Sequence, residues 1–207
     1  NIDLELVSVD DATSGSPDWF RLDMTDFHSP GVIGKTESFR VTVDKNKSLK
    51  KRSGKISIIR KSDGKEMGSV SVAQDGSFAS VEVSAASFNF AAQSKGQSKT
   101  LVVTSNVPVS IGSISGDSDW LEVSPSSVTH DDATVSTEKS FTLSVKSDNT
   151  GDQEREASFN VSWTDENDKL QTKEITVVQM PKDRIFTVNP SSLLFENVGG
   201  EKSFTIT

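Results

Sequence analysis

The chain of 207 residues contains no cysteine and no tyrosine. Without cysteine it can form no disulfide bond and perform no thiolate chemistry, although this absence does not decide the compartment in which it works. Sugar-binding β-sandwiches stack the apolar faces of pyranose rings on exposed Trp and Tyr side chains. With tyrosine absent, a glycan site in this protein has to be built on its three tryptophans.

The chain also lacks a long apolar run and an excess of positive charge. No stretch of about 18 apolar residues occurs, so we expect no segment to span a bilayer. The N-terminus has no secretion leader, so we expect a leader or lipid anchor to lie outside this sequence or to have been removed. The formal net charge of −8 argues against nucleic acid or an anionic membrane as the main partner, because both require clustered Lys and Arg.

What the chain does contain is an internal repeat. The motif Asp18-Trp19-Phe20-Arg21-Leu22 returns as Asp119-Trp120-Leu121-Glu122-Val123, and a third, partial copy at residues 186–207 reproduces residues 81–104. Self-similarity of this kind is typical of a repeat array. Matched residues in the first two copies are Phe39 with Phe141, Arg52 with Arg155, Ile56 with Phe159, Ile58 with Val161, Val72 with Val177, and Gln74 with Gln179.

Each copy has the pattern of short β-strands and no helical period. Apolar and polar residues alternate over residues 38–43 and 140–145, as expected for strands with one buried face. Asp63-Gly64 supplies the turn of a hairpin, whereas we expect an irregular link over residues 23–34. The pattern predicts an all-β protein of tandem immunoglobulin-like β-sandwiches, with about seven strands each.

The repeat predicts three segments. Residues 1–76 are expected to form a first β-sandwich that lacks its first one or two strands, because Ile2 should fall near the end of the second strand. Residues 77–182 are expected to form a complete second β-sandwich, and residues 183–207 the first two strands of a third unit. The connections between units are only a few residues long, so we expect the units to lie nearly end to end as a semi-rigid rod.

Short motifs within the copies carry a family resemblance. They are Pro-Ser-Ser followed by Phe at residues 190–195, Ser-Phe-Thr-Ile-Thr after a Gly turn at residues 203–207, Asp-Trp-Leu-x-Val at residues 119–123, Arg-x-Ala at residues 155–157, and Val-x-Gln at residues 177–179. Together they resemble the BACON domain, over nearly the whole chain. The chain departs from the family pattern at Val107, where the family often has Trp after Ser-Asn.

The resemblance implies an extracellular immunoglobulin-like module. Such domains occur in tandem in surface and secreted proteins of gut Bacteroidetes and in some of their phages. They are often attached to glycan-degrading enzymes or adhesins, and carbohydrate binding has been proposed for them largely from this context. The resemblance therefore implies a binding or presenting module rather than a catalytic one.

The residues themselves also argue against catalysis. His28 and His130 occupy matching loops of separate copies, and no Ser-His-Asp spacing, phosphate loop or zinc pattern occurs. The acidic loops at residues 148–152 and 165–168 suggest calcium, but they lack the spacing of a dedicated calcium loop, which favours solvated turns. We therefore expect no enzyme activity, no cofactor and no metal.

The three tryptophans, Trp19, Trp120 and Trp163, are the candidate carbohydrate-binding residues. Trp163 shares its strand face with Phe159 and Val161, which favours a role in covering the core. Trp19 and Trp120 alternate with the apolar residues that follow them. Either the tryptophans or the apolar residues that follow them must point away from the main core. The tryptophans therefore either seal the end of a sandwich, which we favour, or form an exposed sugar platform.

Charge and chain ends suggest contacts between units. The basic residues 45–52 could contact an anionic glycan or the acidic neighbouring unit, although a solvated loop is favoured. Residues 186–207 supply the two strands that the first unit lacks. Because an unpaired sheet edge favours an added strand, we expect that these tail strands can complete the first unit of another chain and form a homo-oligomer.

We interpret the protein as a non-catalytic spacer or presenting module of a surface or secreted glycan-utilisation protein. It would lie outside the cell or on its outer surface and could bind mucin-type glycans weakly. The alternative is an adhesin or phage virion module that mediates assembly between proteins, including strand complementation between chains.

Overall fold

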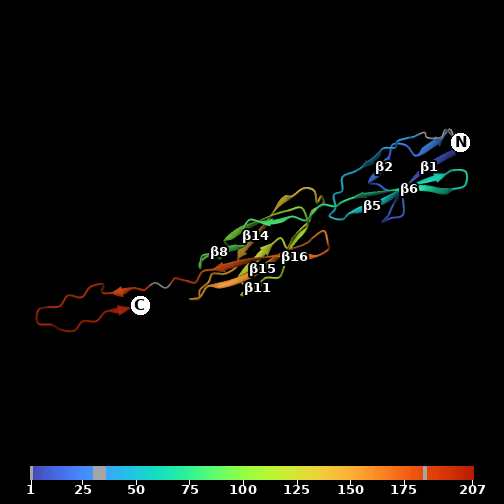
Figure 1. The fold of residues 1–207 in the computed structure, drawn as a ribbon. Coiled ribbons are helices and arrows are strands. Elements are labelled where there is room, and N and C mark those ends of the chain that lie inside the picture. The colour runs from blue at the N-terminus through green and yellow to red at the C-terminus, as the bar shows by residue number, and fades with distance from the viewer. Residues whose placement is uncertain (1, 30–35, 184–185) are drawn as a thin grey trace.

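The computed structural model describes residues 2–29, 36–183 and 186–207, which form 18 β-strands and no helix. The prediction of an all-β sandwich protein is confirmed. Figure 1 shows two groups of strands and a terminal hairpin arranged along one line, with the N-terminus at one end and the hairpin at the other. No helix in the described ranges has the length and apolar character of a membrane span.

The first strand group comprises residues 2–74 and contains two sheets. The larger sheet has the order β3-β1-β5-β6, and β2 pairs with β4 in the smaller one. All of these pairs are antiparallel. Gly64 has φ of 70° in the turn between β5 and β6, as the Asp-Gly motif predicts. The strands are β1 (Ile2–Asp10), β2 (Phe20–Leu22), β3 (Asp26–Ser29), β4 (Val41–Val43), β5 (Arg52–Arg60) and β6 (Lys65–Gln74).

The second strand group comprises residues 81–179 and also contains two sheets, with the orders β12-β14-β9-β7 and β13-β10-β15-β16-β8. Strand β11 also pairs with β15, and β8 runs parallel to β16. The strands are β7 (Val81–Val83), β8 (Ser87–Phe90), β9 (Ser98–Ser105), β10 (Val109–Ile111), β11 (Ser115–Gly116), β12 (Leu121–Ser124), β13 (Ser127–Val128), β14 (Thr137–Val145), β15 (Arg155–Thr164) and β16 (Leu170–Gln179).

Alternation along the strands builds the core of the second group. Phe141, Leu143 and Val145 of β14 are buried between exposed or half-buried residues, and β15 buries its own alternate positions in the same way. The two inner faces meet in one cluster that contains Trp120, Leu101 and Phe90. Among the described residues, the corresponding cluster of the first group contains only four buried apolar residues, namely Leu6, Trp19, Phe20 and Ile56.

Two sequence expectations for the first group were wrong. The link at residues 23–34 is not irregular throughout, because residues 26–29 form β3 on the edge of β1, where Phe27 lies opposite Leu4; residues 30–35 of this link lie outside the described residues. In addition, β1 does not correspond to a second strand. It pairs with β3 and β5 as β10 pairs with β13 and β15, so Ile2 begins the counterpart of the third strand.

The count from Trp19 failed because the turns before the tryptophans differ in length. Leu6 lies opposite Ile58, and Ile111 lies opposite the matching Val161. The chain therefore takes a longer path from β1 to Trp19 than from β10 to Trp120.

The terminal hairpin follows the second group. Its two strands are β17 (Val188–Asn189) and β18 (Thr205–Ile206), which pair antiparallel with each other. Backbone hydrogen bonds between Thr187 and Thr207 extend the pairing by one step. Apolar side chains of this hairpin are exposed to solvent, namely Phe186, Val188, Leu194, Phe195, Val198, Phe204 and Ile206.

Candidate functional site

Trp19 and Trp120 lie inside the packing of their strand groups, with 3% and 0% of their surface exposed. Each ring is covered by a guanidinium group, Arg52 at 4.7 Å from the Trp19 ring and Arg155 at 5.1 Å from the Trp120 ring. This burial leaves neither ring a free face on which a sugar could stack. Both tryptophans therefore act in the structure as seals between loop and core.

The arginines that cover these rings are held in the same way in both groups. Arg52 donates from Nε to Gln74 at 2.9 Å, and Arg155 donates from Nε to Gln179 at 2.8 Å. Each arginine also donates to a backbone carbonyl, that of Asp44 or of Ser147, at 2.6 Å. We call each Trp, Arg and Gln set an arginine lock. It ties the last strand of each group, β6 or β16, to the loop that follows β4 or β14.

The two locks differ at the indole nitrogen. Trp19 donates from Nε1 to the carboxylate of Asp10 at 2.5 Å, whereas Nε1 of Trp120 is buried with no partner among the described residues. The Trp19 hydrogen bond, followed by amide hydrogen bonds from Thr13 and Ala12, holds the pKa of Asp10 below its usual value.

Trp163 is the one tryptophan that reaches a surface groove. It is half-buried and packs its inner face on the core, as its strand position predicts. The groove has a volume of about 310 Å³, and beside Trp163 it contains the exposed Leu170. The residues that line it include five with hydroxyl side chains, namely Ser110, Ser127, Thr129, Ser162 and Thr164. One aromatic ring with surrounding hydroxyls can stack a sugar and hydrogen-bond to it.

The connection between the strand groups, residues 75–80, is held from the side of the first group by Asn46. Its side-chain amide donates to the carbonyls of Lys50 at 2.8 Å and Asp75 at 3.1 Å. The backbone amide of Ser77 donates to the carbonyl of Ser48 at 3.0 Å. Asn149 makes the equivalent bonds at the exit of the second group, to Gln153 and Met180.

Asn106 holds the same connection from the side of the second group, and the sequence patterns did not single it out. Its side chain accepts from the amide of Ser80 at 2.7 Å and donates to the carbonyls of Phe78 at 2.8 Å and Ala133 at 2.6 Å. With 7% of its surface exposed, Asn106 is buried at the junction. Its only sequence signal is that it stands directly after β9, where the family pattern has Ser-Asn.

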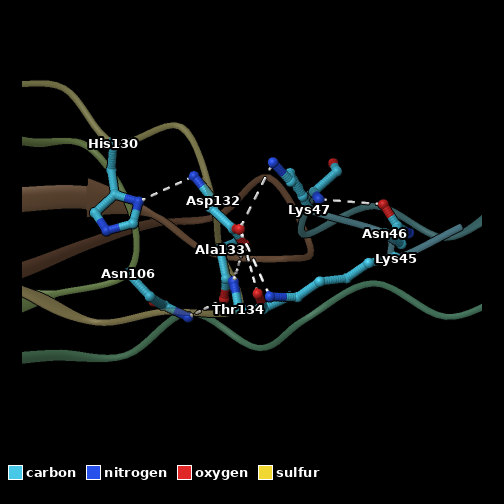
Figure 2. A network of polar contacts seen from close by, with 9 residues as sticks. Lys45, Asn46, Lys47, Asn106, His130, Asp132, Ala133 and Thr134 are labelled. Carbon is cyan, nitrogen blue, oxygen red and sulfur yellow. Dashed lines mark hydrogen bonds and ion pairs between the residues drawn. The ribbon is translucent and has the colours of Figure 1, made fainter.

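The two groups also contact each other directly. The amide of Ala133 donates to the carbonyl of Lys47 at 2.9 Å, and Figure 2 shows Asp132 between Lys45 and Lys47. Their ammonium groups lie 3.6 and 4.0 Å from the Asp132 carboxylate. The Asp132 pKa is lowered, chiefly by hydrogen bonds from Thr134 and further by these lysines.

A second ion pair crosses the junction. Lys50 lies 2.6 Å from the carboxylate of Asp168 and donates to the carbonyl of Glu166 at 2.9 Å. Of the interpretations of residues 45–52, contact with the acidic neighbouring unit holds for Lys45, Lys47 and Lys50, whose side chains remain 49–65% exposed. The loop is basic where the facing turn is acidic, and the short connection brings the two together.

The remaining candidate residues form no catalytic or metal arrangement in the described part of the chain. His28 contacts Asp3 at the far end of the first group, while His130 lines a pocket of about 360 Å³ at the junction. His130 accepts from the amide of Asp132 through Nδ1 at 3.3 Å. No three His, Cys, Asp or Glu side chains of the described residues gather as metal ligands.

Two carboxylates of the acidic loops accept backbone hydrogen bonds, Asp148 from a neighbouring loop and Asp165 within its own turn. Asp148 accepts from the amide of Lys95 at 2.7 Å, and Asp165 accepts from the amides of Asn167 and Lys169, both at 2.9 Å. The amide of Lys169 is the largest cause that lowers the Asp165 pKa. Asp165 thus stabilises its own turn, and Asp148 joins its loop to the loop at Lys95.

The fold and junction described above are those of an all-β sandwich protein. Residues 109–180, most of the second strand group, match the BACON family model, which is described as "Putative binding domain, N-terminal". No curated protein matches the sequence.

The solved structures that this chain matches include a Bacteroides ovatus GH5 xyloglucanase in complex with a XXXG heptasaccharide, with 21% identity over 50% of this chain and 19% of that one and a TM-score of 0.38. They also include the periplasmic chaperone SfaE, with 14% identity, coverage of 50% and 59% and a TM-score of 0.42. A protein of unknown function from Porphyromonas gingivalis W83 has 11% identity, coverage of 87% and 86% and a TM-score of 0.33. The chain thus spans about a fifth of the xyloglucanase, and at these scores the likenesses say nothing about its function.

Proposed function

We propose that the protein is a non-catalytic, extracellular tandem of β-sandwich modules that acts as a semi-rigid spacer or presenting module. Its units would be residues 1–76, 77–182 and the beginning of a third at 183–207. The observation that carries this proposal is the junction, where Asn46 and Asn106 hold residues 75–80 from both sides.

Rigidity follows from how many contacts fix so short a segment. Asp75, Ser77, Phe78, Ala79 and Ser80 each make a hydrogen bond through the backbone to one strand group or the other. A net contribution of about 1 kcal/mol for each such bond is enough, in sum, to disfavour bending at the connection. The surface ion pairs of Lys45, Lys47 and Lys50 add little to stability but select one rotation of the groups.

The match of residues 109–180 to a family described as a binding domain supports a binding or presenting role. The resemblance to the BACON domain implies a location at the cell surface or in the secreted fraction of a glycan-utilising bacterium. A spacer in that setting would hold an attached enzyme or adhesin away from the surface. The geometry of the junction supports this role, since its hydrogen bonds fix the orientation of the two groups.

A distance measurement across the junction tests the proposal. Because the chain has no cysteine, spin labels can be placed at Lys65→Cys and Lys95→Cys, exposed positions on different strand groups. We expect one narrow distance distribution, which broadens in Asn106→Ala and stays narrow in the control Asn89→Ala, an exposed asparagine of the same group. A broad distribution without either alanine substitution would contradict the spacer role.

The Trp163 groove supports weak glycan binding as a second function. Burial assigns Trp19 and Trp120 to the arginine locks, so Trp163 becomes the aromatic platform of choice. Affinity electrophoresis on mucin-type sugars should show retention that Trp163→Ala abolishes and that Val135→Ala, an exposed residue outside the groove, leaves unchanged. No retention on a broad glycan panel would remove this function.

A role in an adhesin or phage virion remains the alternative from a different class. It requires a surface that captures another protein chain. The exposed apolar residues of the first group and of the terminal hairpin are the observation in its favour.

A further inference from the structure

His130 lies in the loop by which the second strand group contacts the first. Figure 2 shows its ring beside Asp132, whose backbone amide donates to Nδ1 at 3.3 Å. A ring nitrogen that accepts a hydrogen bond carries no proton, so the proton of the neutral imidazole is on Nε2. Nε2 is buried and has no hydrogen-bond partner among the described residues. The junction is therefore built around the neutral form of this histidine.

The turn that follows this histidine makes direct contacts with the first group. The amide of Ala133 donates to the carbonyl of Lys47 at 2.9 Å. The Asp132 carboxylate lies 3.6 Å from the ammonium group of Lys45 and 4.0 Å from that of Lys47. The carbonyl of Ala133 also accepts from Asn106, which holds the connection itself. A movement of this turn therefore changes how the first group is held.

Protonation of the imidazole is incompatible with the hydrogen bond that fixes this turn. The proton adds an N–H at Nδ1, which then faces the backbone N–H of Asp132. Two donors cannot form a hydrogen bond with each other, so either the ring or the turn has to move. Histidine is the side chain whose charge ordinarily changes between about pH 5 and 8. The contact is thus exposed to changes of pH in that range.

The surroundings of His130 give the protonated ring a second position. The ring lines the junction pocket of about 360 Å³, which leaves it room to turn. The lysines of the first group in this pocket repel an imidazolium, whereas the carboxylates of the second group attract it. A charged ring is therefore drawn away from the first group. The charged residues that line the pocket with it are Lys47 and Lys50 of the first group and Asp131, Asp165 and Asp168 of the second.

We propose that His130 is a pH switch of the junction. In its neutral form, Nδ1 holds the following turn against the first group, and the two groups keep one orientation. In its protonated form the bond to Asp132 is lost, the turn is released, and the groups rotate more freely about residues 75–80. The connection stays attached, because Asn46 and Asn106 do not titrate and keep their bonds to it.

The direction of the effect follows from linkage. The fixed orientation uses Nδ1 as an acceptor and therefore binds a proton more weakly than the released one. A ligand shifts an equilibrium toward the arrangement that binds it better, so a falling pH favours release. The inference rests on the proposed spacer role and makes the stiffness of the spacer depend on pH.

The distance between labels at Lys65→Cys and Lys95→Cys, measured at about pH 8 and about pH 5.5, gives the readout. We expect one narrow distance at the higher pH and its loss at the lower pH. His130→Gln retains an acceptor that takes up no proton and should stay narrow at both pH values. His130→Ala removes the acceptor and should be broad at both. His28→Gln, at the far end of the first group, is the matched control and should respond like the unmodified chain.

The carboxylate of the same turn does not titrate in this window. The Asp132 pKa is lowered, chiefly by hydrogen bonds from Thr134, so its ion pairs with the lysines persist at the lower pH until the turn itself moves. A loss of the narrow distance that also occurs in His130→Gln would show that another group is responsible and would overturn the proposal.

NMR of the unmodified chain gives a second reading that needs no variant at position 130. The amide signals of Asp132 and Ala133 should shift with the same midpoint as the ring signals of His130. A narrow distance at both pH values, or amide signals that do not follow the titration of the ring, would overturn the switch and leave the spacer role intact. A distance that is already broad at the higher pH would overturn both.

Discussion

Residues 2–74 and 81–179 contain the same arginine lock but differ in how their sheets are closed. The Arg52–Gln74 and Arg155–Gln179 hydrogen bonds have lengths of 2.9 and 2.8 Å, so the lock forms with or without the strands β8 and β9. The core does not. Val70 is half exposed where its counterpart Ile175 is fully buried. Local polar contacts thus set the strand ends, whereas burial depends on the strands that lie across the sandwich.

The largest difference is expected for the tryptophans. Trp120→Ala removes a fully buried ring from a large cluster and should lower the free energy of unfolding of the second group by about 3–5 kcal/mol. Trp19→Ala should cost less, because its cluster has only four buried apolar members and water already reaches its neighbours. Denaturation followed by NMR signals of each group measures both. Equal losses would break the comparison.

A smaller difference is expected for the glutamines of the locks. Gln179 is fully buried, donating to Ala92 at 3.0 Å and Ser94 at 2.8 Å and accepting from Arg155. Gln179→Leu leaves these groups unpaired and should cost about 1–3 kcal/mol. Gln74 is only half-buried, so Gln74→Leu should cost less in the same denaturation experiment. The comparison would fail if Gln74→Leu were the more damaging change.

The smallest effect concerns pH and the Asp10–Trp19 bond. The folded-state pKa of Asp10 is lowered from 3.8, so its stabilisation is present above that value and is lost as pH falls through the lower folded pKa. Asp10→Asn should weaken the acid sensitivity of the first group and leave that of the second unchanged.

Two other carboxylates of the first group also contribute to its acid response. The pKa values of Asp63 and Glu66 are also lowered, by Arg60 and Lys55 respectively, so only the difference between Asp10→Asn and the unmodified chain reports on Asp10. NMR-detected unfolding at a series of acidic pH values gives that difference. An identical acid response in both proteins would show that the Trp19 bond contributes nothing.

Most of the fold was predictable because alternation and turn residues are local signals. The β5–β6 and β15–β16 hairpins follow the predicted segments closely. Strand β3 was not predictable, because residues 26–29 are extended by pairing with β1 and not by a strong pattern of their own. The register of β1 was missed because counting residues cannot detect the longer turn before Trp19.

The site was less predictable than the fold. The expectation that one of the two alternating sets points away from the core was wrong, because Trp19 and Trp120 stand just before β2 and β12 and are buried together with Phe20 and Leu121. The stacking of Arg52 and Arg155 on the tryptophans joins residues far apart in sequence. Asn106 could not be recognised as a junction residue, since its three partners come from the connection and from the loop at Ala133. Such contacts depend on how the strand groups are placed, which no local pattern encodes.

Native-state hydrogen exchange tests most directly whether the two groups differ only in how their sheets are closed. The comparison is between matched strands, β4 with β14 and β6 with β16. We predict much slower exchange in β14 and β16, whose amides are covered by β9 and β8, and similar exchange in β5 and β15, which have paired neighbours on both sides. Equal protection of β6 and β16 would contradict the account.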